Sequence, residues 1–177
     1  MRTLATLAAT CVALLLAGCG FHPLYAVPGA AHGSMRASLG SIYVEPVPDR
    51  LGYELRNTLI DLLDARAESG GAAYRLHVTL SLKSEAVGVQ SQIVGSISQT
   101  AITRYNDTLT VGYELIDLKT NTAVTRGTET GLSAYNVLSS PYATLAVQQD
   151  ANKRAADDIA DRIRIALAVY FAQKPAK

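Results

Sequence analysis

The chain has 177 residues, of which 49% are hydrophobic and 18% charged, and its formal net charge is +1. This length fits one ordinary domain with a real core, and the balanced charge excludes the basic excess typical of nucleic-acid binding. The charged fraction is below the roughly 25% usual for soluble domains, which favours a protein that hides part of its polar surface in a partner.

The N-terminus has the pattern of a secretory signal, with Arg2 followed by an uncharged, apolar stretch up to Ala17. This stretch is too short for a membrane span. It ends in Leu16-Ala17-Gly18-Cys19, which resembles the lipobox of bacterial lipoproteins. The resemblance implies removal of residues 1–18 and acylation of both the Cys19 thiol and the new amine, and two or three such chains give stable membrane anchoring. The alternative is an ordinary signal peptide with a chance cysteine at its end.

The cysteine count agrees with this interpretation. Of the two cysteines, Cys11 lies in the segment that would be removed, and lipidation would consume the thiol of Cys19. The mature chain would then keep no free thiol, which excludes a disulfide, a cysteine-ligated zinc site and a thiol nucleophile. Removing Arg2 with the signal also leaves 15 basic against 15 acidic residues.

The first segments after the lipobox predict a tether, a strand and a helix. Residues 19–40 are rich in Gly, Ala, Pro and His and predict a lipidated tether. Ser41–Val47 reads as a short strand, and Asp49 is placed to cap a helix that runs to about Ala67. Five leucines share one face of this helix: Leu51, Leu55, Leu59, Leu62 and Leu63.

The middle of the chain predicts an antiparallel meander. One strand begins at Tyr74, and its apolar row alternates strictly with polar residues: Tyr74, Leu76, Val78, Leu80 and Leu82. Ser84–Thr100 reads as a long polar connection. Alternation resumes in Leu109–Leu115 and again in Ala123–Ala134, with a turn at Asp117–Thr122 between them.

A long C-terminal helix completes the predicted fold. Pro141 is well placed in its first turn, because a proline there loses no hydrogen bond, and the helix is expected to run to about Phe171. The element order is β-α-β-β-β-α. It predicts a single α+β domain over residues 41–177, with a four-stranded, mainly antiparallel sheet and two helices packed on one face.

The sequence offers little sign of catalysis. The histidines His22, His32 and His77 are scattered and make no metal-binding cluster. "VGSIS" at Val94–Ser98 lacks the spacing of a nucleophile elbow, and no glycine-rich loop of a phosphate site follows a strand. The chain is therefore not expected to be an enzyme or to need a metal or cofactor.

Two stretches carry a family resemblance: "GFHPLY" directly after the lipobox, and Ser133–Phe171 at the other end of the domain. Together with Thr103–Val124, they resemble the outer-membrane lipopolysaccharide (LPS) assembly lipoproteins, the LptE family, in its alphaproteobacterial form. The resemblance implies an α+β domain that plugs the β-barrel of the LPS-assembly protein LptD, supports its assembly and binds LPS during delivery to the cell surface. Gly20, rather than the Asp that often retains lipoproteins at the inner membrane, fits a lipid anchor on the periplasmic side of the outer membrane.

Four cations are candidate LPS contacts, because cations pair with the phosphates of lipid A: Lys83, Arg104, Lys119 and Arg126. The alternative for each is an ordinary solvent-facing residue. Two other functions stay open at this point. One is a lipid-binding auxiliary lipoprotein of an ABC-type envelope transporter. The other is a lipoprotein hydrolase, which the missing nucleophile disfavours.

Overall fold

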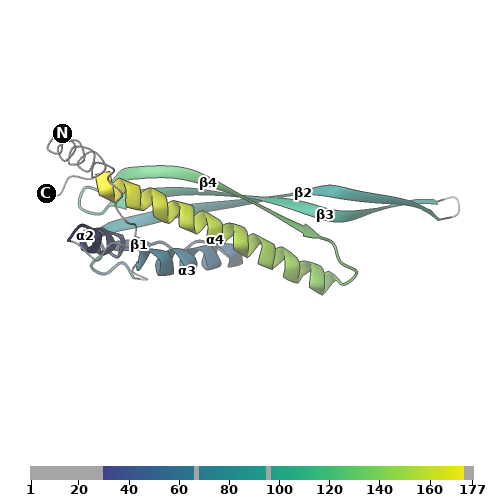
Figure 1. Ribbon diagram of the computed structural model, residues 1–177, viewed down its shortest axis with the longest axis horizontal. Coiled ribbons are helices and arrows are strands. Elements are labelled where there is room, and N and C mark those ends of the chain that lie inside the picture. The colour runs from purple at the N-terminus through teal and green to yellow at the C-terminus, as the bar shows by residue number, and fades with distance from the viewer. Residues whose placement is uncertain (1–29, 66–67, 95–96, 174–177) are drawn as a thin grey trace, which may run out of the picture. The chain divides into compact units, whose positions relative to one another are not determined.

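The computed structural model describes residues 30–65, 68–94 and 97–173 (Figure 1). The signal segment and Cys19 lie outside this range. The chain divides into two compact units, and the second, Ser34–Lys177, holds the domain described here. Its fold is α+β, as the sequence predicts. The elements in chain order are α2 (Ala30–Leu39), β1 (Ile42–Val44), α3 (Asp49–Leu63), β2 (Tyr74–Val94), β3 (Ile97–Asp117), β4 (Thr122–Asn136) and α4 (Pro141–Gln173).

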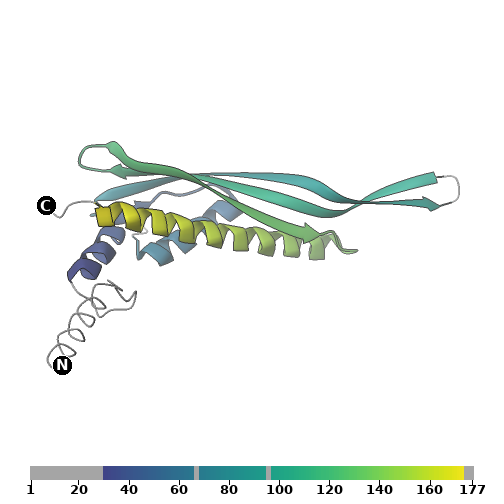
Figure 2. The ribbon, with the colours of Figure 1, turned by 45° about the horizontal axis from the view of Figure 1, so that its top comes forward.

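The sheet has four strands in the order β1-β2-β3-β4. The short β1 pairs in parallel with the start of β2, whereas β2–β3 and β3–β4 are antiparallel. Helices α3 and α4 pack against each other, α3 also contacts β1, and α4 contacts β3 and β4. Figure 2 shows α4 running along one side of the sheet. The prediction of two helices on one face of a mainly antiparallel sheet is therefore confirmed.

The last part of the expected tether is helical. Residues 30–39 form α2. Six of these ten residues are Ala, Leu, Met or Arg, which favour a helix over an extended linker. Leu39 packs against the domain core, and the Arg36 guanidinium lies 3.1 Å from the Asp64 carboxylate at the end of α3. Residues 19–29 of the expected tether lie outside the described range.

Helix α3 ends at Leu63, the last leucine of its apolar face, rather than near Ala67 as the sequence predicts. It follows Pro48, which makes no side-chain cap, and Asp49 is its first residue rather than its cap. It ends at Leu63 because the next residue, Asp64, adopts a left-handed conformation with φ of 53°. The leucine face is confirmed, since Leu55, Leu59 and Leu63 are all buried in the core.

The core lies between the two helices and the middle of the sheet. Leu76 and Val78 of β2 are buried next to their partners on β3, and α4 covers them with three fully buried side chains: Ile159, Ile163 and Leu167. The predicted apolar row weakens along β2, because Leu80 is half-buried and Leu82 is 40% exposed. Only the first half of this row is core.

The predicted polar connection at Ser84–Thr100 is wrong, because most of it is strand. Strand β2 continues to Val94 and pairs with β3 back to Ile97. We call residues 86–94 and 97–103 the arm. Val and Ile alternate there with Ser, Thr and Gln, which suits a strand. Two register shifts on either side of Gly88 cancel each other, and this local irregularity interrupts the alternation and hides the pattern in the sequence.

Gly88 is the residue that this irregularity requires. A Cβ atom at this position would lie 2.6 Å from the Thr103 hydroxyl and 2.9 Å from Cβ of Arg104 on the facing strand. Strand β4 stops at Asn136, which pairs with Arg104, so the arm continues beyond it as two strands only (Figure 1).

Substituting Val78 tests the core. Val78→Asp places a carboxylate in the row that faces the helices, where it has no cationic partner, and we expect it to abolish folding at a cost of several kcal/mol. Thr79→Asp is the matched control, because the neighbouring side chain is exposed on the opposite face. Thermal melts followed by circular dichroism should show a folded control and an unfolded Val78→Asp. Equal melts would contradict the burial of this row.

Candidate functional site

The face of the sheet opposite the helices is a candidate site because its side chains are polar and accessible. Odd-numbered residues of β3 such as Leu109 and Val111 are buried under the helices, so the even-numbered ones point to the other side. We call that side the bare face. It is rich in hydroxyl groups, all of them exposed or half-exposed: Thr79, Ser81, Thr108, Thr110, Thr128 and Thr130.

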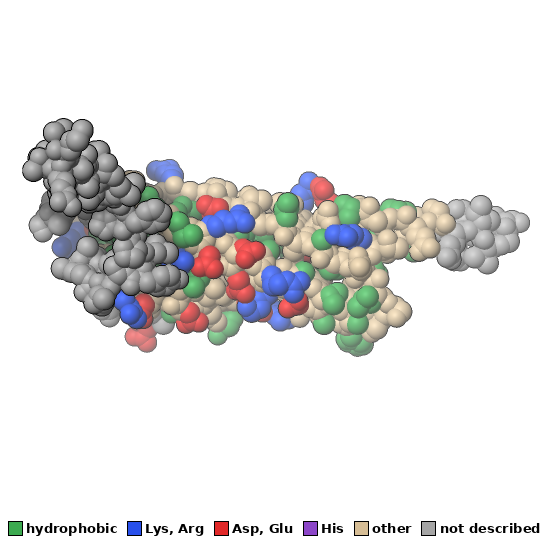
Figure 3. Space-filling model, in the orientation of Figure 1, with side chains coloured by type: hydrophobic (Ala, Val, Ile, Leu, Met, Phe, Trp, Pro, Cys, Tyr) green, Lys and Arg blue, Asp and Glu red, His purple; other side chains and the backbone are tan. Residues whose placement is uncertain are grey.

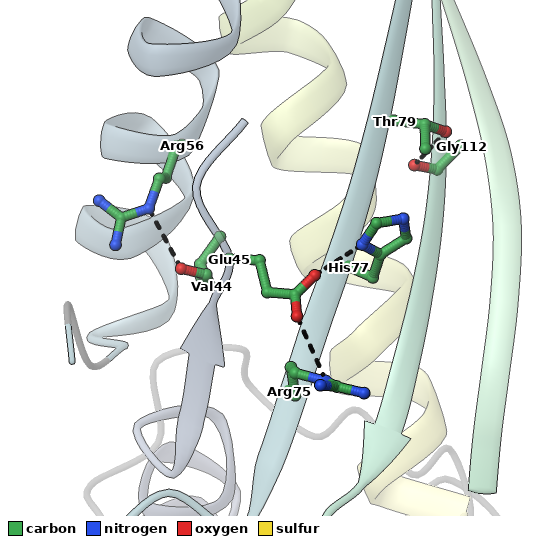
Figure 4. Close-up of polar contacts among 7 residues, drawn as sticks. All are labelled: Val44, Glu45, Arg56, Arg75, His77, Thr79 and Gly112. Atoms are coloured by element: carbon green, nitrogen blue, oxygen red, sulfur yellow. Dashed lines mark hydrogen bonds and ion pairs between the residues drawn. The ribbon is translucent and has the colours of Figure 1, made fainter. Parts of the chain in front are cut away.

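At one edge of the bare face, the Glu45 carboxylate joins β1 to β2 by contacting Arg75 and His77 (Figure 4). Arg75 and His77 are two residues apart on β2 and therefore point to the same side. The Glu45 carboxylate lies 2.6 Å from Nδ1 of His77 and 3.4 Å from Nε of Arg75. On the preceding residue, the Val44 carbonyl accepts a hydrogen bond of 3.1 Å from Nε of Arg56 on α3. These contacts hold the three-residue β1 in place.

Beside this cluster lies a shallow hollow of about 260 Å³. Gly112 forms part of its floor, and a Cβ there would come 2.8 Å from the Thr79 hydroxyl. That hydroxyl donates to the Gly112 carbonyl at 3.4 Å (Figure 4). The hollow is also lined by His77 and by the charged pair Glu114 and Arg126, whose carboxylate and guanidinium lie 4.0 Å apart. The hollow can hold a small polar group, and the charges of this pair oppose each other.

Two of the predicted LPS contacts already have acidic neighbours. Arg126 lies near Glu114, as above, and the ammonium group of Lys83 lies 2.6 Å from the Glu85 carboxylate. The hydrogen bond and charge of Glu85 raise the pKa of Lys83, and Lys83 in turn lowers the pKa of Glu85. Both side chains are exposed, so this pair is screened by solvent and contributes little to stability.

The four predicted contacts do not form one cluster. Lys83 lies opposite Thr108 on β3, and Arg126 lies opposite Glu114 on β3. Arg104, like those two β3 positions, is even-numbered, so all three cations lie on the bare face. Lys119 lies apart from them, in the turn between β3 and β4. Along β3 the three positions are spaced by roughly 13 and 20 Å at 3.3 Å per residue. They can meet one large, multiply charged ligand and are too far apart to bind one phosphate group.

A buried polar network lies on the helix side, and our sequence analysis did not identify it. Asp107 is fully buried and accepts a hydrogen bond of 2.9 Å from Nδ2 of Asn152 on α4. The Ser133 hydroxyl on β4 donates to Oδ1 of Asn152 at 2.5 Å. Asp107 lies two and four residues before the core residues Leu109 and Val111, so strand alternation places its side chain on the same buried face. That alternation is the sequence signal that could have identified Asp107 as buried. The network ties α4 to both β3 and β4 at the end of the core.

The network lies beside a stacked aromatic pair. The rings of Tyr105 and Tyr135 are stacked, with centroids 5.6 Å apart. The pKa of Tyr135 is raised, mainly by burial of its hydroxyl and to a smaller extent by the nearby charges of Asp107 and Tyr105. The other carboxylate oxygen of Asp107 has no hydrogen-bond partner among the described residues. Asn152 is therefore the main support for this buried charge, and its loss would expose the full cost of burying it.

Asn152→Ala tests this support. Removing the amide leaves the Asp107 carboxylate buried without its donor, and we expect a loss of about 2–3 kcal/mol in unfolding free energy. Asp150→Ala is the control, because it removes only an exposed ion pair with Arg154 on the same helix and should cost less than about 1 kcal/mol. Urea unfolding curves measure both. A loss for Asn152→Ala no larger than that of the control would show that the network does not support the core.

The described residues give no sign of a metal site or a membrane-spanning helix. Within residues 30–65, 68–94 and 97–173, no three His, Cys, Asp or Glu residues come together as metal ligands. None of the helices in the same ranges is long and apolar enough to cross a membrane. Cys19, the predicted lipid-attachment residue, lies outside them.

A family model described as LptE, lipopolysaccharide assembly, matches residues 39–167. That range includes the whole sheet and most of α4. No curated protein matches the chain. Among solved structures, a candidate lipoprotein from Caulobacter crescentus is 29% identical, with a TM-score of 0.62, and the match covers 80% of this chain and 98% of that one. Rare lipoprotein B from Shewanella oneidensis has the same fold at 12% identity, with a TM-score of 0.50 and coverage of 72% and 93%.

Proposed function

The chain belongs to the LptE lipopolysaccharide-assembly family, and from that membership we propose that its domain plugs an outer-membrane β-barrel of the LptD type. The match over residues 39–167 is the observation that carries the proposal. The family is non-enzymatic, so the chain is an assembly lipoprotein rather than a hydrolase. In this role it supports folding of the barrel and helps to deliver LPS to the cell surface.

The surface of the domain supports enclosure by a polar wall. The bare face presents threonine and serine hydroxyls, which suit the polar interior of a membrane barrel. Charged side chains gather over α4 and the neighbouring part of the sheet, whereas the outer part of the arm shows none (Figure 3). A partner can therefore enclose the arm without burying unpaired charges.

The bare face is also the favoured place for LPS. Lys83, Arg104 and Arg126 lie along it, and their spacing suits a ligand with several separated negative groups. Arg126 is the best placed of the three, because it borders the hollow that also includes His77. Lys119, in the turn, is the least well placed.

The proposed location is the periplasmic side of the outer membrane, with the chain anchored through lipid on Cys19. The lipobox and Gly20 after it support this location. Two or three acyl chains hold a protein at a membrane stably, whereas one chain binds only reversibly.

Partner recovery tests the plug. We expect the full-length lipoprotein, purified in detergent from outer membranes, to bring down one large β-barrel protein in a one-to-one ratio. An enclosed plug buries more than the roughly 1,600 Å² of a standard interface, so the complex should survive extensive washing. Quantitative mass spectrometry gives the ratio, and depletion of the lipoprotein should lower the amount of folded barrel.

Purification of the lipoprotein alone, with LPS export intact after depletion, would contradict the plug. Recovery of an inner-membrane permease instead of a barrel would favour the alternative of an auxiliary lipoprotein of an ABC-type transporter. A control purification uses the Val78→Asp variant, whose loss of fold should remove any specific partner.

Cys19→Ser tests the anchor. A serine hydroxyl does not accept the diacylglyceryl group, so we expect the variant to remain an uncleaved precursor without lipid. Metabolic labelling with a palmitate analogue measures incorporation, and Cys11→Ser is the matched control because that cysteine lies within the signal segment. Equal labelling of wild type and Cys19→Ser would show that Cys19 is not the attachment site.

A further inference from the structure

Strand β3 continues beyond the end of its neighbour β4 and leaves an edge without a partner strand. The β3–β4 pairing stops at Arg104 and Asn136, while β3 extends to Ile97. The last contact is the Val137 N–H, which donates to the Thr103 carbonyl at 2.9 Å before the chain turns towards α4. Within the described part of the chain, no strand pairs with residues 97–102 on that side. We call this the open edge.

Strand alternation defines which backbone groups face the open edge. Because the Thr103 carbonyl faces the β4 side, the backbone N–H and C=O of Ala101 face the same side. On the opposite strand, Gln90 pairs directly with Ala101. In an antiparallel pair, two opposite residues either both direct their backbone N–H and C=O groups at each other or both direct them away. Because the groups of Ala101 point away from β2, those of Gln90 point away from β3 and face the outer edge of β2.

The arm lacks the usual protection of an exposed edge. None of the residues from 86 to 103 is charged, and none is proline. Natural edges are normally shielded by charged side chains, prolines or a covering element, and a hairpin of two strands alone is only marginally stable in water. A strand from another molecule would satisfy the backbone groups and give the arm the third strand that it needs.

Apolar side chains at the base of the open edge favour a partner on the β4 side. The β4–α4 junction exposes Val137 at 37%, Leu138 at 43% and Tyr142 at 87%, and Val137 adjoins the open edge through its bond to Thr103. On the other side of the arm, the base of the β2 edge carries the exposed pair Lys83 and Glu85. Charges of this kind discourage strand addition at β2.

We propose that an extended, uncharged segment of the partner protein adds as a β-strand to the open edge of β3, in line with β4. Main-chain hydrogen bonds to residues such as Ala101 provide the pairing, and the end of the added strand covers Val137, Leu138 and Tyr142. The identity of the partner, the barrel that encloses the domain, rests on the proposed function. The addition of a strand at the open edge rests on the unpaired backbone groups of β3.

Two proline variants of the full-length lipoprotein separate the two edges. Ala101→Pro removes the N–H that faces the open edge and places a ring there, whereas Gln90→Pro makes the same change on the outer edge of β2. Both side chains are exposed and belong to one cross-strand pair, and proline is tolerated at strand edges that face solvent. We expect the barrel recovered with Ala101→Pro to fall about tenfold and that with Gln90→Pro to match wild type.

The outcomes distinguish the inference from the proposed function. If wild type recovers the barrel and both variants keep it, or both lose it equally, the open edge is not the pairing site, while the plug stands. If wild type recovers no barrel, the proposed function is overturned first. Dimers of purified wild type that disappear in Ala101→Pro would make the occupant a second copy and overturn the assignment to the partner. Circular dichroism of both variants confirms that their domains are folded.

Discussion

The whole domain depends on one constraint, which is that the sheet buries only one face. Leu76 and Val78 on β2, with their neighbours on β3, need a cover, and α3 and α4 provide it. Burial of such side chains contributes about 25 cal/mol per Å² of apolar surface. Because this cover lies on one side, the opposite face stays polar and accessible, and that face carries three of the four candidate LPS contacts.

The part of the sheet that the helices bury is shorter than strands β2 and β3, and this divides the domain into a packed body and the arm. The fully buried part of the sheet ends near Asp107, where Asn152 donates a hydrogen bond to one carboxylate oxygen of Asp107 and Ser133 donates one to Asn152. The pairing of β3 with β4 stops a little further on, at Arg104, and beyond that residue β3 continues with β2 alone. Polar networks of this kind can define a single arrangement of packed elements, and here the network marks the boundary between the self-supporting body and the arm.

Charge is distributed unevenly along the same boundary. The body carries ion pairs on its helices and between Arg75 and Glu45, whereas the sequence from 86 to 103 has no charge. A hairpin of two strands is only marginally stable in water, and an arm without charged side chains can be enclosed without burying unpaired charges. The distribution therefore agrees with the proposal that a partner encloses this member of the LptE family.

The sequence by itself predicted the elements whose side-chain periodicity is regular. The leucine face of α3, the row from Tyr74 to Val78, and the long helix that begins at Pro141 are all local patterns of 3.6 or 2 residues, and the element order predicted the α+β class. The lipobox and the two stretches with family resemblance also required no structure. These features depend on residues close together in the chain.

Only the tertiary structure decided the features that depend on distant residues. The arm was read as a loop, because the bulge at Gly88 breaks the alternation that identifies a strand. Asp107 gives no local sign that Asn152, 45 residues away, will pair with it. The open edge exists because the pairing with β4 stops at Arg104 while β3 extends seven residues further, to Ile97, and no pattern within β3 shows where its neighbour will stop.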